Sequence, residues 1–260
     1  MPNYIDIKPS GGDTGAPLNQ RRRMELIQRY VPLQGKKMLD CGCGTGQYVI
    51  GFLNAGVDAY GIDFFKEKIQ EFHTRYPEIA DRVNVGNAEK INFPDDSFDV
   101  VLVNEVLEHI PDQVKALLEI RRILKPDGVF IVFSPNRFYP FETHGITMKK
   151  NRKEIPPYFP FIPYIPLRLG VLIFEYRARN YWPHELRELI KQQGFDLLHT
   201  GYSWQTFENI SGQQPAAAGM LRLPLRKIFF FLETIPIIRA FGVSQMIIAA
   251  KKSDENNGKS

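Results

Sequence analysis

The chain has only two cysteines among its 260 residues, and they stand one residue apart, as Cys41 and Cys43. Two thiols this close together do not suit an ordinary disulfide framework, and they are too few for a four-ligand zinc site. The chain also lacks an apolar run of about 18 residues that could span a membrane, and residues 1–13 contain no run of signal-peptide length. We therefore expect a soluble, cytoplasmic protein with reduced thiols.

A strong excess of one charge is also missing. The 33 basic and 29 acidic side chains leave a net charge of +4, which is small for a protein that binds nucleic-acid phosphates. The short basic run Arg21–Arg23 has no recognition module beside it, so we expect a solvated helix face there and no nucleic-acid partner. The basic excess lies in residues 136–260, which carry 17 basic against 10 acidic side chains.

Short apolar runs alternate with helical patterns along most of the chain, which predicts a parallel sheet covered on both faces. The fold class we predict is α/β, with a doubly wound, mostly parallel seven-stranded sheet. The expected strands are residues 37–41, 57–62, 82–85, 98–103, 129–133, 195–200 and 245–250. The expected helices are residues 19–30, 46–54, 66–76, 113–124, 184–193 and 225–232.

Two excursions interrupt this pattern, after the fifth and after the sixth expected strand. Six prolines lie between Pro140 and Pro166, which disfavours a regular helix or a central strand there. In chain order, we expect a flexible segment (1–18), a single domain (19–252) and a polar tail (253–260). Within the domain, we expect a core at 36–135 and insertions at about 138–182 and 205–243.

A glycine-rich bend, Asp40–Gly46, ends the first expected strand and opens a helix. Glycines let the backbone pass close to a ligand, and a helix N-terminus offers unpaired amides. The spacing Gly-x-Gly-x-Gly differs from the Gly-x-Gly-x-x-Gly of dinucleotide sites, which disfavours a nicotinamide oxidoreductase. Asp63 ends the next strand, 21 residues after Gly42, where a carboxylate can accept hydrogen bonds from both ribose hydroxyls. We therefore expect a nucleoside ligand.

These residues carry a resemblance to a known family. Leu39–Gly46 resembles the first motif of the class I S-adenosylmethionine-dependent methyltransferases, in particular the type 11 and ubiquinone-biosynthesis-like group, and Asp63 resembles that family's ribose-binding acid. Three further blocks follow in the family's order: Asn87–Glu89, Phe93–Val100 and Leu124–Gly128. The resemblance covers roughly residues 36–135 and implies a Rossmann-like fold with S-adenosyl-L-methionine as cofactor.

The resemblance also implies a role for each matching residue. Asp40 would orient the glycine loop or meet the amino group of the ligand, Asp63 would hold the ribose, and Phe64 would lie beside the adenine. The other implied cofactor-binding residues are Gly42, Cys43, Gly44 and Gly46 in the loop, Asn87 and Ala88 at the adenine edge, and Asn104 near the methionine moiety.

Two histidines are candidate catalytic residues, because a hydroxyl acceptor must lose a proton during methyl transfer. His109 follows the fourth expected strand, and His144 follows the fifth. If residues 105–109 are helical, Glu105, Glu108 and His109 share one face of the helix. The pattern Glu-x-x-Glu-His resembles that of metal-assisted O-methyltransferases that act on ubiquinone precursors and on small-RNA 3′ ends. His144 would then be the further ligand. Family members that bind no metal share this pattern, so we assign no metal. The alternative to a catalytic role is that both histidines have only structural roles.

The two insertions combine aromatic with basic residues. Residues 158–166 are aromatic and proline-rich, with Arg168, Arg177 and Arg179 after them, and residues 221–241 repeat the combination. One reading is a hydrophobic lid with a basic rim, suited to a lipid-like or aromatic acceptor or to peripheral contact with an anionic membrane. The other reading is a cap that packs on the sheet and keeps its charges solvated.

We predict a methyltransferase that acts on a small-molecule acceptor, with O-methylation preferred because two histidines could serve a hydroxyl group. One alternative is N- or C-methylation of a small metabolite. Another alternative is a partner subunit that binds the cofactor without catalysis. The acceptor and the oligomeric state stay open at this point.

Overall fold

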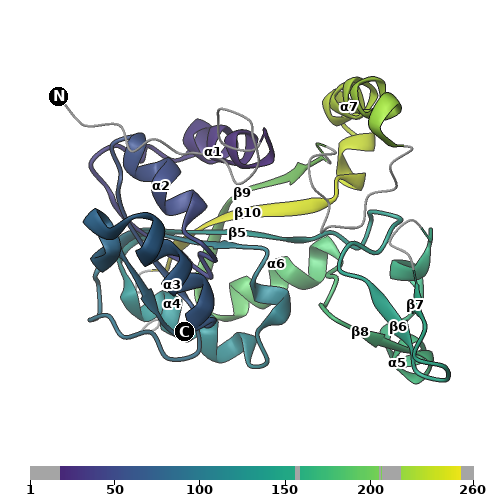
Figure 1. Cartoon of the computed structure of the whole chain (residues 1–260), viewed down its shortest axis with the longest axis horizontal. Helices are drawn as coiled ribbons and strands as arrows, with labels where there is room; N and C mark the ends of the chain where they lie inside the picture. The colour runs from purple at the N-terminus through teal and green to yellow at the C-terminus, as the bar shows by residue number, and fades with distance from the viewer. Residues whose placement is uncertain (1–17, 156–158, 205, 207–217, 253–260) are drawn as a thin grey trace, which may run out of the picture. The chain divides into compact units, whose positions relative to one another are not determined.

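A computed structural model describes residues 18–155, 159–204, 206 and 218–252 of the chain. It contains a seven-stranded sheet in the order β3-β2-β1-β4-β5-β10-β9. Figure 1 shows three of these strands, β5, β10 and β9, next to one another. The α/β class and the seven-stranded, mostly parallel sheet predicted from the sequence are confirmed. The expected tail at 253–260 and all but the last residue of the expected flexible segment lie outside the described residues.

The seven strands are β1 (Lys37–Cys41), β2 (Asp58–Asp63), β3 (Val83–Val85), β4 (Phe98–Asn104), β5 (Leu124–Pro135), β9 (Phe195–Ser203) and β10 (Ser244–Lys251). The α-helices between and before these strands are α1 (Leu18–Tyr30), α2 (Gln47–Asn54), α3 (Lys66–Arg75), α4 (Gln113–Ile123) and α6 (Pro183–Gln192). Short 3-10 turns lie at η1 (Pro77–Arg82), η2 (Leu107–His109), η3 (Ile162–Tyr164) and η4 (Ile238–Phe241).

The burial of the central strands explains why short apolar runs in the sequence indicate them. In β1 and β4 nearly every side chain is buried, as parallel strands covered on both faces require. β1 pairs in parallel with β2 on one side and with β4 on the other. The chain therefore reverses its direction of winding between β1 and β4, and open α/β sheets bind ligands at the carboxyl ends of strands at such a switch point.

The chain divides into two compact units. The first takes residues up to 133 together with 188–199 and the residues from 247 on, and the second takes 134–187 and 200–246. The single-domain organisation expected from the sequence stays a prediction. Among the described residues, no helix has the length and hydropathy of a membrane span.

The second unit contains elements that the sequence did not predict. These are a small antiparallel sheet in the order β7-β6-β8, made of β6 (Ile146–Met148), β7 (Glu154–Ile155) and β8 (Phe174–Tyr176), and a short helix, α5 (Leu167–Ile173). Strands of two or three residues are too short for an alternating pattern to be read. The helix expected at 225–232 is present as the longer α7 (Ala218–Thr234), which holds Pro224 within it.

Candidate functional site

The glycine-rich loop follows β1 and has three glycines with left-handed backbone angles, φ 89° at Gly42, 58° at Gly44 and 76° at Gly46. A Cβ atom at Gly42 would stand 2.3 Å from Val106, and one at Gly46 would stand 2.3 Å from Phe72, so packing alone requires these two glycines. Among the described residues, no atom lies within 4 Å of a Cβ added at Gly44. The main chain at Gly44 therefore leaves room for the close approach of a ligand, and cofactor binding there stays a prediction.

Asp63 fastens this loop to the end of β2. Its buried carboxylate accepts hydrogen bonds from the amides of Gly44, at 2.8 Å, and Phe65, at 2.9 Å. Each carboxylate oxygen has a second lone pair, so Asp63 can still accept hydrogen bonds from two hydroxyl groups. The neighbouring Phe64 ring is 69% exposed and offers a flat apolar face at the same strand end.

Asp40 lies at the switch point, where it stands in register with Gly61 of β2 and Leu102 of β4. Its side chain is buried, and within the described part of the structure neither carboxylate oxygen has a hydrogen-bond partner. Burial, together with the negative charge of Asp63, raises the pKa of Asp40 to about 7. A buried carboxylate in this state is stabilised by a cationic group brought next to it.

The turn after β3 carries the two residues expected at the adenine edge. The amide of Gly86 donates to the carbonyl of Asp63 at 3.0 Å, which ties this turn to the end of β2. Asn87 is exposed, and its Oδ1 accepts from the amide of Glu89 at 2.8 Å; Ala88 is half-buried between them. Asn87 and Ala88 thus lie at a strand end next to that of Asp63.

The two cysteines are buried free thiols, Cys41 at the end of β1 and Cys43 in the glycine loop. Burial, with the charge of Asp40 adding to it, raises the pKa of Cys41 to about 12 and raises that of Cys43 as well. Since thiolates and not thiols bind metals, both side chains act here as small apolar groups in the core.

Arg23 is a site residue that the sequence analysis missed, and the expected solvated face is wrong at this position. Its side chain is buried, and its guanidinium donates to Asn104 Oδ1 at 2.5 Å and to Glu105 Oε1 at 2.6 Å. The guanidinium also lies 4.9 Å from the centre of the Phe133 ring. The available signal was the helical period, because Gln20, Arg23 and Ile27 share the buried face of α1.

Tyr48 is a second residue that the sequence analysis did not single out. It lies in the first turn of α2, directly after the glycine loop, and burial raises its pKa to about 12. Its hydroxyl group interacts with the side chain of Asn104. Asn104 is therefore held from α1 and from α2 at once, at the carboxyl end of β4.

The helical reading of residues 105–109 is wrong. Glu105 has a left-handed φ of 55° and Val106 a φ of −130°, so only Leu107–His109 form a turn, η2. Glu105 therefore leaves the face that it was expected to share with Glu108 and His109, and its carboxylate pairs with Arg23 instead. This ion pair removes Glu105 from the expected ligand set.

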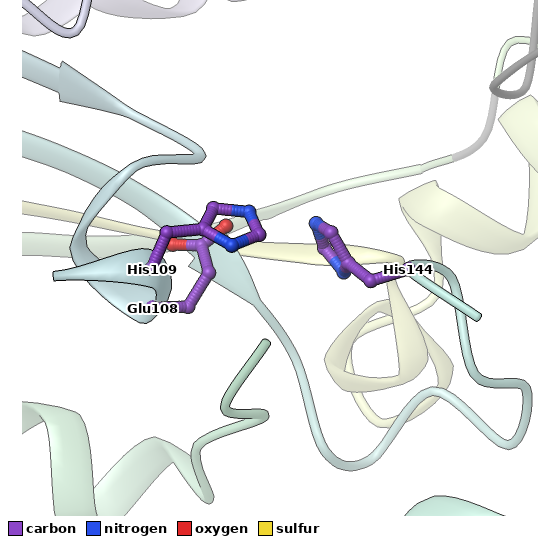
Figure 2. A group of neighbouring side chains, drawn as sticks. All are labelled: Glu108, His109 and His144. Carbon is purple, nitrogen blue, oxygen red and sulfur yellow. The ribbon is translucent and has the colours of Figure 1, made fainter. Parts of the chain in front are cut away.

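Figure 2 draws Glu108, His109 and His144. Glu108 is buried and His109 exposed, and both belong to the first unit, on η2. His144 belongs to the second unit, where its amide donates to Glu142 Oε1 at 3.0 Å and its Nδ1 lies 3.1 Å from Thr143 Oγ1. Carboxylate and imidazole groups of these types are the donors that a divalent ion takes.

Two aromatic residues near α6 are part of the packing of the second unit. Tyr181 is 1% exposed, and the Trp182 ring stacks on Tyr164 with 5.9 Å between ring centres. Phe138 meets the Trp182 ring edge-on, with 5.3 Å between ring centres. These contacts describe core packing rather than a free aromatic surface.

Comparison with known proteins decides the family. A family model described as a methyltransferase domain matches residues 39–132. The demethylmenaquinone methyltransferase of Geobacillus stearothermophilus is 30% identical over 64% of this chain and 69% of its own length. The chain belongs to the class I S-adenosylmethionine-dependent methyltransferases. The cofactor of this methyltransferase is therefore S-adenosyl-L-methionine, as the resemblance implied.

Two further similarities agree with this family. The ubiquinone biosynthesis O-methyltransferase of Methylococcus capsulatus is 34% identical over 44% of this chain and 50% of its own length. A solved S-adenosylmethionine-dependent methyltransferase from Mesorhizobium loti has the same fold, with a TM-score of 0.54 and 16% identity over 87% of this chain and 96% of that one. The methyltransferase spans about half to three-fifths of the length of several curated relatives that it matches.

The residues at the switch point suit the chemistry of this cofactor. S-Adenosylmethionine joins a ribose and an adenine to a chain that carries an ammonium and a sulfonium group. The first unit offers a carboxylate with spare lone pairs at Asp63, an exposed side chain at Phe64 and an open backbone at Gly44. It also offers the buried carboxylate of Asp40, which has no hydrogen-bond partner among the described residues. A diol, an aromatic base and a cation thus each find a matching group.

Proposed function

We propose that this methyltransferase moves the methyl group of S-adenosylmethionine to a hydroxyl group of a small, hydrophobic acceptor. The observation that carries the proposal is the arrangement at the ends of β1 and β2, where an open glycine loop lies between the buried carboxylates of Asp40 and Asp63. Methyl transfer needs little covalent machinery, because most of the catalysis is the alignment of the two reactants with water excluded.

Each residue at the strand ends has a role in this proposal. Asp63 would hold the ribose hydroxyls, Phe64 would lie against the adenine, and Asp40 would offset the positive charge of the methionine portion. The remaining cofactor contacts would come from Gly42, Cys43, Gly44 and Gly46 in the loop, from Asn87 and Ala88 at the adenine edge, and from Asn104 at the methionine portion.

His109 and His144 are the proposed catalytic residues. When bound, the cofactor supplies an electrophilic methyl group. The chain must then accept the proton of the acceptor hydroxyl, and an imidazole is the side chain most suited to that task near neutral pH. His109 is exposed on η2, directly after the strand that ends in Asn104, and we propose it as the first of the two bases.

The proposed acceptor is lipid-like or aromatic. Two relatives act, by their names, on demethylmenaquinone and in ubiquinone biosynthesis, and both names refer to quinones. The second half of this chain also exposes apolar rings and basic groups, which supports peripheral contact with a lipid surface. N- or C-methylation is the second candidate. The cytoplasmic location stays a prediction.

Calorimetry with S-adenosylmethionine, S-adenosylhomocysteine and NAD tests the cofactor site. The Gly44→Ala variant tests the glycine loop, and Gly56→Ala is its matched control. Both glycines have positive φ, and in the described part of the chain neither has a neighbour within 4 Å of an added Cβ. We expect similar losses of folding stability and a loss of S-adenosylmethionine affinity in Gly44→Ala alone. Binding of NAD without S-adenosylmethionine, or equal affinities of the two variants, would overturn the assignment.

Methyl transfer itself is tested with radiolabelled S-adenosylmethionine and cell extract separated into lipid and aqueous fractions. The proposal expects label in a lipid-soluble product that resists ester hydrolysis but releases the label as methyl iodide in hot hydriodic acid, as a methyl ether does and a C-methyl group does not. Label confined to water-soluble amines would favour N-methylation instead. Transfer should fall at least about hundredfold in His109→Ala, the usual contribution of a general base.

A further inference from the structure

The helix α5 places an unusual number of apolar side chains in solvent. Five of its seven residues are large, apolar and between 40% and 73% exposed, namely Leu167, Leu169, Val171, Leu172 and Ile173. The buried residue of the helix is Gly170, where an added Cβ would meet the hydroxyl of Tyr176 on β8. The helix thus rests on the small sheet through its glycine, beside β6 and β8 (Figure 1). Apolar groups gathered in this way mark an interaction surface.

Basic side chains accompany this helix. Between residues 145 and 180 the chain has two acidic residues, Glu154 and Glu175, against seven basic ones. Both acidic groups are paired with arginines, Glu154 with Arg177 and Glu175 with Arg152. The segment therefore keeps a clear positive excess. Its basic residues are Lys149, Lys150, Arg152, Lys153, Arg168, Arg177 and Arg179.

Two of these basic residues are fixed at the helix itself. Lys149 donates from its Nζ to the carbonyl of Val171 at 2.7 Å and from its amide to the carbonyl of Ile173 at 2.9 Å, which places an ammonium group at the C-terminal end of α5. Arg168 is exposed within the helix, between two exposed leucines. Positive charge and apolar surface are therefore contiguous here.

We propose that α5 and the basic side chains around it dock this methyltransferase on the surface of an anionic lipid bilayer. The apolar side chains would enter the boundary between headgroups and acyl chains, while the lysines and arginines meet the lipid phosphates. A second copy of the chain is a poorer occupant, because two positively charged surfaces would repel each other. The docking rests on the proposed function in one respect, since a lipid-like acceptor would be taken from the same bilayer.

Vesicle flotation tests the docking with the full-length protein. The vesicles are phosphatidylcholine alone or phosphatidylcholine with phosphatidylglycerol, at low and at high salt. The double variant Leu169→Gln/Leu172→Gln removes apolar groups that are 56% and 73% exposed. Its matched control is Leu118→Gln/Leu198→Gln, which removes two leucines of the first unit that are 50% and 60% exposed.

We expect binding to the anionic vesicles that weakens in high salt, because salt screens the attraction between the basic groups and the lipids. The α5 double variant should bind at least about tenfold more weakly, since each leucine would lose its burial in the interface. Lys150→Gln/Lys153→Gln should reduce binding about 25-fold, at roughly fivefold per basic residue. The Leu118/Leu198 control should bind like the wild type.

Three outcomes would overturn the docking. In the first, the wild type does not float with anionic vesicles. In the second, the α5 double variant floats as well as the Leu118/Leu198 control. In the third, the wild type self-associates without binding vesicles, and the α5 substitutions abolish this self-association. In the last case a second copy occupies the surface. Calorimetry with S-adenosylmethionine in the absence of lipid, on the same variants, reports on the proposed function separately, because α5 contains none of the proposed cofactor contacts.

Discussion

Asp40 makes the stability of this methyltransferase depend on pH in an unusual direction. Its folded-state pKa is about 7, raised from 3.8 first by burial and then by the charge of Asp63. When the pKa of a carboxyl group is higher in the folded state than in the unfolded state, its contribution to stability is fully present at pH values below the unfolded-state pKa. This contribution is lost as the pH rises to and through the folded-state pKa. The protein without its cofactor should therefore become less stable between about pH 4 and pH 7.

The size of this effect follows from the difference between the two pKa values. A shift of one pKa unit corresponds to about 1.4 kcal/mol, so a rise from 3.8 to about 7 corresponds to about 4 kcal/mol. No discount for solvent screening applies, since the side chain is 3% exposed. The Asp40→Asn variant cannot ionise and should keep this stability, so it should be more resistant to unfolding than the wild type at pH 8.

Cofactor binding should have the opposite dependence. In the proposed function the positive charge of S-adenosylmethionine lies near Asp40, and a cation there favours the ionised carboxylate. The affinity should therefore rise with pH up to about 7, by at most about tenfold per pH unit, and binding below that pH should release a proton. Asp40→Asn should bind S-adenosylmethionine more weakly and without this pH dependence.

Thermal and urea unfolding between pH 5 and pH 8 measure the first effect, and calorimetry in buffers of different ionisation enthalpy counts the released proton. Asp196→Asn is the control, since it removes one exposed carboxylate of the same unit. The reasoning about burial is refuted if wild type and Asp40→Asn show the same pH dependence of unfolding. The assigned contact is refuted if both bind S-adenosylmethionine equally well at pH 8.

Three further predictions test other residues of the site. Asp63→Ala should weaken S-adenosylmethionine binding by about a hundredfold, since two hydrogen bonds to a charged group are lost, and unchanged affinity in calorimetry would remove its ribose contact. Arg23→Met should lower the melting temperature by roughly 6–12 °C, because it removes the buried guanidinium that pairs with Glu105 and donates to Asn104. Arg23→Met/Glu105→Gln should recover part of the loss, and Arg21→Met should cost little. Methyl transfer should survive chelator treatment and Glu108→Gln within about twofold, and a tenfold loss restored by a divalent ion would contradict the proposed absence of a metal.

The elements that the sequence predicted well share a physical cause. Strands such as β1 and β4 are buried on both faces over most of their length, so their burial appears as short apolar runs, Met38–Leu39 in β1 and Val100–Val103 in β4. The bend after β1 requires positive φ at successive glycines, so its backbone geometry is visible in the residue types. In both cases the cause acts within a few residues, which is why a single sequence shows it.

The failures have a cause of the opposite kind. Residues 105–109 carry a pattern that suits a helix, yet Glu105 turns away because a partner on α1, 82 residues earlier in the chain, pairs with its carboxylate. The sheet of β6, β7 and β8 is built from pairings across sequence gaps that no local pattern marks. Contacts between distant segments decided each of these features.

Two buried charged groups near the switch point, Arg23 and Asp40, are treated differently by the chain. Glu105 is 24% exposed and pairs with the buried guanidinium of Arg23, so the chain itself supplies the compensation for burying that charge. Asp40 lies at the end of the neighbouring strand, and in the described part of the chain its carboxylate has no hydrogen-bond partner and a carboxylate, Asp63, as its charged neighbour. Burying a carboxylate in this way costs stability, which selection for folding alone would remove. A cationic ligand that arrives at the end of β1 offsets that cost, so the unbalanced charge is expected of a binding site for a sulfonium cofactor.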